Sequence, residues 1–520
     1  MNLGRYISRS SLHYSDKVCL VHGKRRYSYR EFEQRANSLA RGLMHLGLMR
    51  GDRLAVQSWN RSEMIEIEVA CYKAGIVRVP MNAHLSPSES VHVLNDSETK
   101  AVIADPMHMD HILQHKSSIP KIEYLICLEN TPAGVLDYEK TIAQSSVEML
   151  DIDLDPSELA VLAYSSGTTG KMKAVMQSFA NRLAMIRKAL MIPGLSIEPG
   201  DVFVHAGPIS HASGMWSMPM MFRGGCNLVL ERFNVEKFLE AVQEEKASLT
   251  LLVPTMIHML LDFPESRNYD LSSLKRVFYG AAPISKTRLR QAIDELFGSI
   301  LIQGYGMTET TSAITILTSK DHLDALREDH QDRLASCGRP CFDTEVKVVD
   351  EAGGEVSTGE IGEIIARGPD VMVGYYKDAE LTKATIRGGW VHTGDMARVD
   401  DEGYIYIVDR KSETIISGGF NVYPSEVEGV LYAHPAVFEA CVVGVPDEKW
   451  GEAVKAVVVV KKGCVVTEQA LMDHCKAFLA GYKKPQSIDF VNDLPKNPSG
   501  KIPRRVVREK YWRDRDRKLI

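Results

Sequence analysis

Short apolar runs alternate with helical patterns along the first part of this chain, and this alternation constrains its fold most. Residues 54–56 predict a strand, residues 63–73 a helix, and residues 76–79 the next strand. The same order recurs at residues 227–230, which precede a helical pattern over residues 235–245. Strands that alternate with helices are typical of a parallel sheet covered by helices on both faces. The sequence therefore predicts an α/β fold.

The texture of the sequence changes after about residue 330, where short apolar segments are separated by Gly/Asp turns. These segments predict a β-rich subdomain over about residues 330–409. Strands and helices then follow in a compact pattern, and 520 residues are too many for one ordinary core. We predict a large N-terminal domain over residues 1–409, with mixed and parallel sheets flanked by helices. A small C-terminal α+β domain is expected over residues 410–520.

The bulk properties exclude several classes of protein. Hydrophobic residues make up 44% of the chain and charged residues 25%, as in globular proteins. A net charge of −6 gives no general attraction to nucleic acid. No run of 18 apolar residues is present, so no transmembrane segment is expected. Nine cysteines without a CxxC pair favour reduced thiols and a cytoplasmic protein.

Two groups of basic or titratable residues are expected to face solvent. His108, His111 and His115 have helical spacing, and we interpret them as an exposed helix face rather than a metal site. Eight basic residues crowd the tail between Arg504 and Lys518, where three acidic residues dilute their charge. We expect this tail to form a solvated helix.

A loop of small residues follows the apolar segment at residues 159–163, which predicts a buried strand. The loop reads Tyr-Ser-Ser-Gly-Thr-Thr-Gly-Lys over residues 164–171. Its backbone N–H groups, hydroxyls and ammonium can all face one anion, as in polyphosphate sites. The spacing is not the Walker pattern, because two threonines separate the glycines and Met172 follows the lysine. A plain Ser/Gly surface loop is the alternative.

Four further motifs follow this loop in a fixed order. They are Gln-Gly-Tyr-Gly-Met-Thr-Glu at 303–309, Trp-Val-His-Thr-Gly-Asp at 390–395, Asp-Arg-Lys at 409–411, and Leu-Pro-Lys-Asn-Pro-Ser-Gly-Lys-Ile at 494–502. Together the five motifs resemble the adenylate-forming superfamily, which includes acyl-CoA synthetases, luciferases and peptide-synthetase adenylation domains. The resemblance covers nearly the whole chain and is closest to acyl-CoA synthetases.

The resemblance implies a two-step reaction. A carboxylic acid reacts with ATP to give acyl-AMP and pyrophosphate, and the acyl group then passes to coenzyme A. The implied cofactors are ATP, Mg²⁺ and coenzyme A. Two alternatives stay open: an amide-forming ligase that passes the same acyl-AMP to an amine, and an inactive nucleotide-binding scaffold. The sequence identifies neither the acid nor the oligomeric state.

The resemblance also assigns residues to the nucleotide. The residues expected to bind the phosphates are Ser165, Ser166, Gly167, Thr168, Thr169, Gly170, Lys171 and Lys173. Tyr305 and the segment Gly280, Ala281 and Ala282 would enclose the adenine, with Gln303, Gly304, Gly306 and Met307 in the same motif as Tyr305. Asp395 is expected at the ribose, and Arg410 at the ribose or a phosphate. Glu309 and Thr168 are the expected Mg²⁺ ligands, since Mg²⁺ prefers one or two carboxylates plus phosphate oxygens.

Three further residues carry the implied chemistry. Thr308 can donate to the α-phosphate. His211 matches a position that lines the acyl pocket, and the Met-rich run after it is either core or part of an apolar acyl site. Lys501 is implied to bridge the acid and the α-phosphate in the transition state. Because Lys501 belongs to the small domain, the resemblance implies that this domain is mobile and closes on the nucleotide.

The second step would use another face of the small domain. Gly418 and Gly419 let backbone pass close to a narrow pantetheine arm. Tyr482 and Lys484 resemble positions that meet the adenine and phosphates of coenzyme A, and a basic helix end is the alternative.

The chain departs from the family pattern at several positions. Met172 and Ala174 flank Lys173, which keeps the family's lysine and can share or replace the role of Lys171. Ser412 occupies the hinge position, where Asp or Lys is common, and Ile416 stands where a lysine often lies. These departures leave open the amide-forming alternative.

Overall fold

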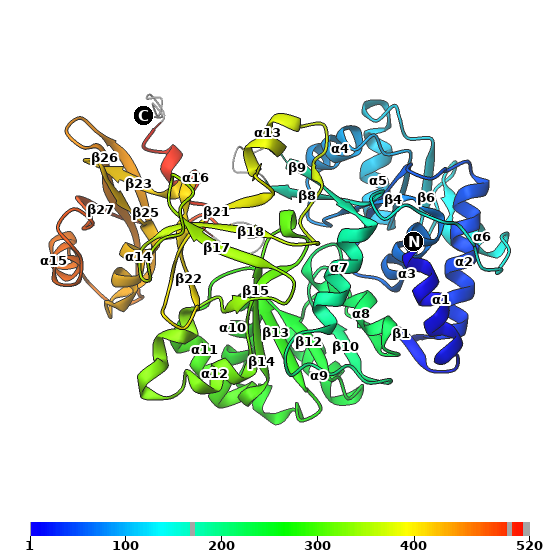
Figure 1. Cartoon of the computed structure of the whole chain (residues 1–520), viewed down its shortest axis with the longest axis horizontal. Helices are drawn as coiled ribbons and strands as arrows, with labels where there is room; N and C mark the ends of the chain where they lie inside the picture. Colours follow the sequence, from blue (N-terminus) through cyan, green and yellow to red (C-terminus); the bar gives the residue numbers. More distant parts are fainter. Residues whose placement is uncertain (1, 167–171, 497–501, 513–520) are drawn as a thin grey trace. The chain divides into compact units, whose positions relative to one another are not determined.

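The computed structural model describes residues 2–166, 172–496 and 502–512, and its chain divides into two compact units. The first unit comprises Met1–Val346 and Ala366–His392, and the second comprises Lys347–Ile365 and Thr393–Ile520. Figure 1 shows that the first unit is built of sheets and helices, whereas strands dominate the second. The predicted α/β fold is confirmed.

An eight-stranded sheet of the first unit carries the N-terminal strand–helix alternation. Its order is β19-β9-β8-β4-β3-β5-β6-β7. The strands β8, β4, β3, β5, β6 and β7 run parallel to one another. Strand β9 pairs antiparallel with β8, and β19 pairs antiparallel with β9. The strands are β3 (Arg53–Gln57), β4 (Val77–Met81), β5 (Ala101–Ala104), β6 (Tyr124–Cys127), β7 (Leu136–Asp137), β8 (Leu159–Ser166), β9 (Met172–Ser178) and β19 (Gly374–Tyr375).

A nine-stranded sheet forms the other half of the first unit, in the order β16-β15-β14-β13-β12-β10-β11-β1-β2. Its central strands are parallel, and β2, β15 and β16 are antiparallel additions at its two ends. The strands are β1 (Val18–His22), β2 (Arg25–Ser28), β10 (Val202–His205), β11 (Cys226–Val229), β12 (Leu249–Leu252), β13 (Arg276–Gly280), β14 (Leu301–Gly306), β15 (Ala313–Leu317) and β16 (Arg339–Pro340).

The helices of the first unit flank these sheets. They are α1 (Leu3–His13), α2 (Tyr29–His45), α3 (Ser62–Ala74), α4 (Pro87–Asp96), α5 (Pro106–Gln114), α6 (Tyr138–Ala143), α7 (Phe179–Leu190), α8 (Ser217–Phe222), α9 (Val235–Glu244), α10 (Pro254–Asp262), α11 (Lys286–Ala292), α12 (Ser319–Asp324) and α13 (Ala379–Thr385). Ser28 and Glu31 form a capping box at the start of α2, as their spacing predicts.

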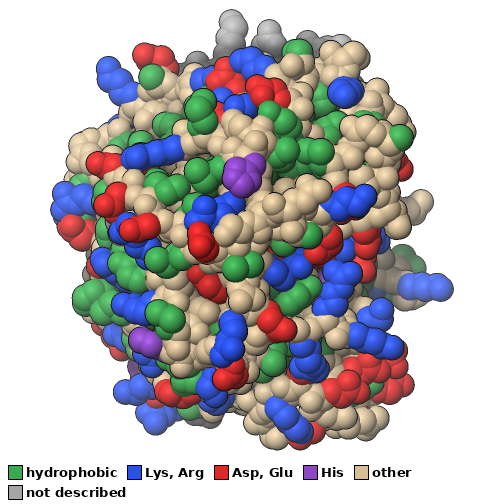
Figure 2. Space-filling model, turned by 90° about the vertical axis from the view of Figure 1, so that its right-hand side faces the viewer, with side chains coloured by type: hydrophobic (Ala, Val, Ile, Leu, Met, Phe, Trp, Pro, Cys, Tyr) green, Lys and Arg blue, Asp and Glu red, His purple; other side chains and the backbone are tan. Residues whose placement is uncertain are grey.

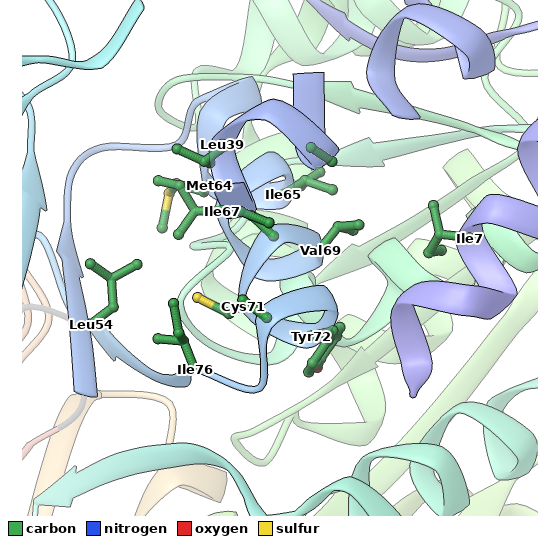
Figure 3. Packing of buried hydrophobic residues seen from close by; sticks show 14 of the residues in the cluster. Ile7, Leu39, Leu54, Met64, Ile65, Ile67, Val69, Cys71, Tyr72 and Ile76 are labelled. Atoms are coloured by element: carbon green, nitrogen blue, oxygen red, sulfur yellow. The ribbon is translucent and has the colours of Figure 1, made fainter. Parts of the chain in front are cut away.

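Helix α3 forms the centre of the largest core. Every one of its residues is buried, and apolar side chains project from it in several directions, as expected for a fully enclosed helix. Figure 3 shows Ile7 of α1, Leu39 of α2 and Leu54 of β3 around it. The helix is capped by Gly75, whose φ of 71° favours glycine, and a Cβ there would lie 2.7 Å from the Leu154 side chain.

The second unit holds two sheets. One contains β17 (Glu345–Val349), β18 (Gly362–Arg367), β21 (Trp390–Val399) and β22 (Ile405–Arg410). The other has the order β24-β23-β26-β25, with β27 parallel to β26. Its elements are β23 (Ile415–Ser417), β24 (Phe420–Val422), β25 (Val437–Asp447), β26 (Gly451–Val460), β27 (Ser487–Phe490) and the helices α14 (Pro424–Ala433), α15 (Glu468–Phe478) and α16 (Arg504–Glu509).

The division by compactness differs from the predicted domain boundary. The β-rich segments at 347–365 and 393–409 group with the C-terminal part, whereas residues 330–346 and 366–392 group with the first unit. Arg504 of the C-terminal part contacts Asp409 of β22 from 95 residues away, and a contact of this kind carries no signal in local sequence texture. A hinge near residue 410 stays a prediction, because a hinge and a compact boundary are different properties.

The expectation of an exposed histidine face on α5 is wrong for His108. Its side chain is 3% exposed. Nδ1 contacts Asp105 at 2.7 Å, and Nε2 contacts the Ala83 carbonyl at 2.9 Å. The Asp105 carboxylate also accepts a hydrogen bond from the His108 N–H, so it caps the start of α5 and contacts the imidazole ring. His111 is exposed, as expected, whereas His115 is half-buried. His108 is therefore a satisfied core residue.

Charges of both signs are interspersed over the face of the molecule shown in Figure 2. Arg5, for example, pairs with Asp151 and Asp153, and Arg35 pairs with Glu139. This mixture agrees with the small net charge of −6.

Two buried histidines make the stability of the first unit depend on pH. His322 lies between the Tyr279 hydroxyl at 2.8 Å and the Thr318 carbonyl at 2.7 Å, and burial lowers its pKa to about 4. Burial likewise lowers the pKa of His205 to about 4, between Ser213 and Asn227. Both are neutral when folded but take up protons below about pH 6.5 when unfolded.

We predict that stability is complete above about pH 7 and falls as the pH drops from about 6.5 toward 4. The loss at about pH 5 is about 2 kcal/mol for each histidine. His322→Gln and His205→Gln should each flatten part of this dependence in urea unfolding followed between about pH 7.5 and 5. An unchanged slope in both variants would contradict the assignment.

Candidate functional site

The predicted phosphate loop joins the two strands of a hairpin in the first unit. Strands β8 and β9 pair antiparallel, with Ser165 opposite Lys173 and Ser166 opposite Met172. The Tyr164 hydroxyl donates to Asp96 at 2.7 Å and anchors β8. The loop residues Gly167, Thr168, Thr169, Gly170 and Lys171 lie outside the described residues. The structure therefore places Ser165 and Lys173 side by side, and the role of the loop stays a prediction.

The predicted adenine residues lie on adjacent strands, and close backbone contacts explain their glycines. Gly280 ends β13 opposite Gly304 of β14. A Cβ at Gly280 would lie 2.2 Å from the Gly304 carbonyl oxygen. A Cβ at Gly306 would lie 2.1 Å from the Ser312 carbonyl oxygen, where β14 meets β15. Strand packing thus requires both glycines, whether or not a ligand binds.

The other members of this motif are accessible. Gln303, Tyr305, Met307 and Ala282 are half-buried, and Ala281 is exposed with a φ of 63°. The Met307 N–H donates to the Thr310 hydroxyl at 3.0 Å, which fixes the chain as it leaves β14. The structure brings these residues together at the ends of β13 and β14.

The turn after β14 presents the two residues expected to act on the phosphates. Thr308–Thr310 form one 3-10 turn, in which Thr308 is half-buried and Glu309 is 7% exposed. The Tyr375 hydroxyl donates to Glu309 Oε1 at 2.7 Å. The Met372 N–H donates to the Glu309 carbonyl at 2.8 Å. Sequence reasoning missed Tyr375, because a tyrosine 66 residues from its partner gives no local signal.

A network of buried polar side chains is hydrogen-bonded to the backbone of this turn. Glu68 Oε1 accepts from Arg78 and Arg182 at 3.0 Å each, and from the Tyr72 hydroxyl at 2.7 Å. All four residues are buried. Arg182 also reaches Gln177 of β9 at 3.4 Å, and the Gln177 amide donates to the Thr308 carbonyl at 3.3 Å. A chain of hydrogen bonds therefore joins α3 and α7 to the turn.

Glu309 fits a Mg²⁺ ligand. Its carboxylate is buried yet already engaged by a donor, as metal-bound carboxylates usually are. Within the described residues, no group of three or more His, Cys, Asp or Glu side chains is placed to hold a metal ion. Phosphate oxygens of the substrate are the usual additional Mg²⁺ ligands. The second predicted ligand, Thr168, lies outside the described residues.

His211 lies on the loop between β10 and α8. Its ring reaches solvent, and Nδ1 contacts the Ser210 hydroxyl at 2.8 Å. The surrounding protein atoms and the nearby His84 lower its pKa, which favours the neutral imidazole. A Cβ at Gly214 would lie 2.0 Å from the Ile209 carbonyl oxygen, so this loop can fold only with glycine there.

The Met-rich run after His211 is mostly core. Met218, Met220 and Met221 are at most 1% exposed. Trp216 stacks on Phe203 and Phe278 at ring distances of 5.6 and 4.0 Å. Met215 is the half-buried exception. The core interpretation is confirmed for the buried members, and an acyl-binding role stays a prediction.

In the second unit, the two predicted ribose residues lie together. Asp395 of β21 is directly opposite Arg410 of β22, and Arg410 Nε lies 2.6 Å from Asp395 Oδ1. The Asp395 side chain is 5% exposed and that of Arg410 is 45% exposed. A carboxylate held beside a half-exposed guanidinium can accept from hydroxyls while the arginine contacts an anion.

Arg504 is an exception to the predicted solvated tail helix, whose residues 513–518 lie outside the described residues. Its guanidinium on α16 contacts three carboxylates, those of Asp409, Glu413 and Glu428. The Asp409 contact is 3.0 Å, and the Ser425 N–H also donates to Asp409 at 2.8 Å. Arg504 is 20% exposed, whereas its neighbour Arg505 is 54% exposed and pairs only with Glu509 among the described contacts. Tertiary contacts between distant segments bury the cation.

The predicted coenzyme A face also assembles. Gly418 and Gly419 form the turn between β23 and β24, with φ of 58° and 82°. A Cβ at Gly418 would lie 2.5 Å from the Trp450 ring. Tyr482 stacks on Phe420 at 4.8 Å, and both rings are exposed. Lys484 is half-buried, and it is Lys483 that pairs with Glu426. Trp450 was not predicted.

Comparison with known proteins agrees with this arrangement. The family model described as AMP-binding enzyme matches residues 7–376, and that described as AMP-binding enzyme C-terminal domain matches residues 426–501. The chain belongs to the AMP-binding enzymes. The predicted membership of the adenylate-forming superfamily is thereby confirmed. The unmatched residues 377–425 include the motifs around Asp395 and Arg410.

The chain is similar to several acyl-CoA ligases over its whole length. Feruloyl-CoA synthase of Amycolatopsis sp is 36% identical over 94% of this chain and 95% of its own. Medium/long-chain-fatty-acid–CoA ligase FadD8 of Mycobacterium tuberculosis is 34% identical over 96% of this chain and 88% of its own. The expectation of an AMP-forming acid ligase that uses ATP, Mg²⁺ and coenzyme A is confirmed.

Solved structures give the same fold. ATP-bound MatB from Rhodopseudomonas palustris has a TM-score of 0.87 and 31% identity over 99% of both chains. The amide bond synthetase McbA from Marinactinospora thermotolerans has a TM-score of 0.86 and 28% identity over 98% of this chain and 100% of its own. Among the described residues, none of the helices combines the length and apolarity that a membrane crossing needs.

We predict that Arg504→Gln destabilises the second unit by about 3 kcal/mol, because it leaves three partly buried carboxylates without their cation. Arg505→Gln removes the same charge from the same helix and should cost less than about 0.5 kcal/mol, since its ion pair is exposed. Urea unfolding of both variants measures the difference. Equal stability of the two variants would contradict the structural role of Arg504.

Proposed function

We propose that this enzyme activates a hydrophobic or aromatic carboxylic acid as acyl-AMP and then transfers the acyl group to coenzyme A. The observation that carries the proposal is the turn after β14, where Thr308 and the buried, hydrogen-bonded Glu309 follow directly on the predicted adenine segment. The names of the acyl-CoA ligases that resemble the chain support the same chemistry.

The first step joins two anions, so the protein has to supply positive charge and donors. A carboxylate oxygen of the acid attacks the α-phosphorus of ATP, and the bond from that phosphorus to pyrophosphate breaks. Thr308 would donate to the α-phosphate, and Lys173 with the loop at 167–171 would hold the outer phosphates. Glu309 would hold Mg²⁺, which when bound neutralises phosphate charge. Lys501 would bridge the acid and the α-phosphate.

The ribose and the acid have their own residues. Asp395 would accept from the ribose hydroxyls, with Arg410 beside it at the ribose or a phosphate. His211, neutral at physiological pH by the direction of its pKa shift, would line the acyl site near the reacting carboxylate. A neutral ring adds no charge to an apolar pocket, which favours an acid with an apolar body.

In the second step the thiol sulfur of coenzyme A attacks the acyl carbonyl carbon, and AMP leaves. The turn at Gly418 and Gly419 would pass beside the pantetheine arm, and the exposed Tyr482–Phe420 stack would meet the adenine, with Lys484 at a phosphate. An exposed aromatic pair is suited to stacking a base.

A second candidate is an amide-forming ligase that captures the same acyl-AMP with an amine. Two observations favour it: the fold similarity to the amide bond synthetase McbA, and the residues of the second-step region. Ser412 is exposed and Ile416 is 48% exposed, so neither position presents the charge that the family pattern often has.

We also propose that the enzyme works in the cytoplasm. All nine cysteines are free thiols, and seven of them are buried. Burial raises the pKa of Cys71 and of Cys226 to about 12, so these thiols stay protonated. Free, unreactive thiols are typical of proteins from reducing compartments.

One assay separates these possibilities. A panel of aliphatic and aromatic acids is incubated with ATP, Mg²⁺ and either coenzyme A or amines, and the products are identified by mass spectrometry. We expect AMP, pyrophosphate and an acyl thioester. An amide with no thioester would establish the second candidate. Release of ADP would exclude adenylation altogether.

We predict that Lys501→Ala slows acyl-AMP formation by about 10²–10³, the usual cost of one transition-state donor. Thiolysis of added acyl-AMP should be spared, because its leaving group is AMP. The matched control is Lys496→Ala, which removes a lysine of the same segment that pairs with Glu439 at 2.7 Å. Equal loss of both half-reactions in the Lys501 variant would contradict its proposed role.

A further inference from the structure

We propose that Tyr375 is a positioning residue that fixes the Glu309 carboxylate for binding of the metal–nucleotide complex. The inference rests on the proposed function, in which Glu309 is a Mg²⁺ ligand. Tyr375 does not touch the reacting atoms itself; it acts through Glu309. Its place in the fold is the short strand β19, which pairs antiparallel with β9, with Tyr375 opposite Val175.

The segment 372–376 holds Glu309 at two points. The Tyr375 hydroxyl donates to Oε1 at 2.7 Å, and the Met372 N–H donates to the main-chain carbonyl at 2.8 Å. Both Tyr375 and Glu309 are 7% exposed, so water competes little for these bonds. Glu309 is thus held at its main-chain carbonyl and at one carboxylate oxygen, which leaves its side chain little freedom to rotate. Hydrogen bonds to ligating carboxylates act in this way at metal sites.

Tyr375 also faces the predicted phosphate-binding lysine. The Lys173 ammonium lies 5.7 Å from the centre of the Tyr375 ring, while the hydroxyl of the same ring contacts Glu309. One side chain thus contacts a cation with its ring and an anion with its hydroxyl. This geometry lets Lys173 serve a phosphate and Glu309 serve a metal ion without the two charges joining in a salt bridge.

The backbone around Tyr375 is itself fixed. The Tyr375 N–H donates to the Thr382 hydroxyl at 2.8 Å. On either side, the Val373 N–H donates to Met176 and the Tyr376 N–H to Ala174, each at 2.9 Å. The donor is therefore held in place before any ligand binds.

The neighbouring tyrosine provides a matched control. The Tyr376 hydroxyl donates to Glu98 Oε2 at 2.9 Å, and Tyr376 is half-buried. Tyr375→Phe and Tyr376→Phe thus each delete one hydroxyl that donates to one carboxylate, at adjacent positions of one segment. Only the first carboxylate belongs to the proposed metal site.

The test measures metal binding directly. Mn²⁺ is titrated into the full-length enzyme with an ATP analogue whose α,β-bridge is a non-cleavable methylene, and bound ion is read by electron paramagnetic resonance. We expect Tyr375→Phe to weaken metal binding about 10–100-fold, and Tyr376→Phe to leave it at the wild-type value. In turnover, Tyr375→Phe should raise the KM for Mg²⁺ by a similar factor while kcat at saturating Mg²⁺ changes less.

Two further variants separate this inference from the proposed function. If Glu309→Gln binds Mn²⁺ as the wild type does, Glu309 is not the ligand and that part of the proposed function fails. If Glu309→Gln loses the ion but Tyr375→Phe does not, only the role of Tyr375 fails. Adding Tyr375→Phe to Glu309→Gln should cause no further loss of binding. A further independent loss would overturn the inference, because the hydroxyl would then act elsewhere.

Discussion

The first unit depends on the hydrogen bonds that the buried Glu68 carboxylate accepts. It lies at the centre of α3, has no exposed surface, and accepts hydrogen bonds from Arg78, Arg182 and Tyr72 through one oxygen. A buried charge of this kind is tolerated only with several donors around it. The pairing ties α3, β4 and α7 together and, through Gln177, reaches the Thr308 carbonyl. The position of the turn at Thr308–Thr310 therefore depends on the same polar network as the core.

Close backbone contact is the second device that shapes the site. Gly280 and Gly306 bring β13, β14 and β15 together where side chains cannot fit, and the turn that follows carries Thr308 and Glu309. The segment 372–376 returns from a distant part of the chain to bond both ends of Glu309. In the second unit, Arg504 also links distant segments, since its guanidinium on α16 contacts carboxylates of α14 and of the segment 409–413. Polar groups that are distant in sequence thus set the geometry of each unit.

Much of the fold could be predicted from the sequence. Hydrophobic periodicity located α3, α9, β3, β4 and β8, because each depends on neighbouring residues. The motifs also placed Asp395 and Arg410, and Gly280 and Gly304, in pairs that the structure brings together. Other features escaped. His108 was expected on the surface and is buried against Asp105, and Arg504 was expected in solvent and is clamped by three carboxylates.

The sequence by itself determined the α/β class, the family and the order of the motifs, since these depend on local patterns and on residue types. Only the tertiary structure decided which side chains hold the motif residues in place. Tyr375 reaches Glu309 across 66 residues, Gln177 reaches Thr308 across 131, and Arg504 reaches Asp409 across 95. Such contacts depend on how distant segments pack. Hydrophobic periodicity reports which face of an element is buried but not which residue lies opposite.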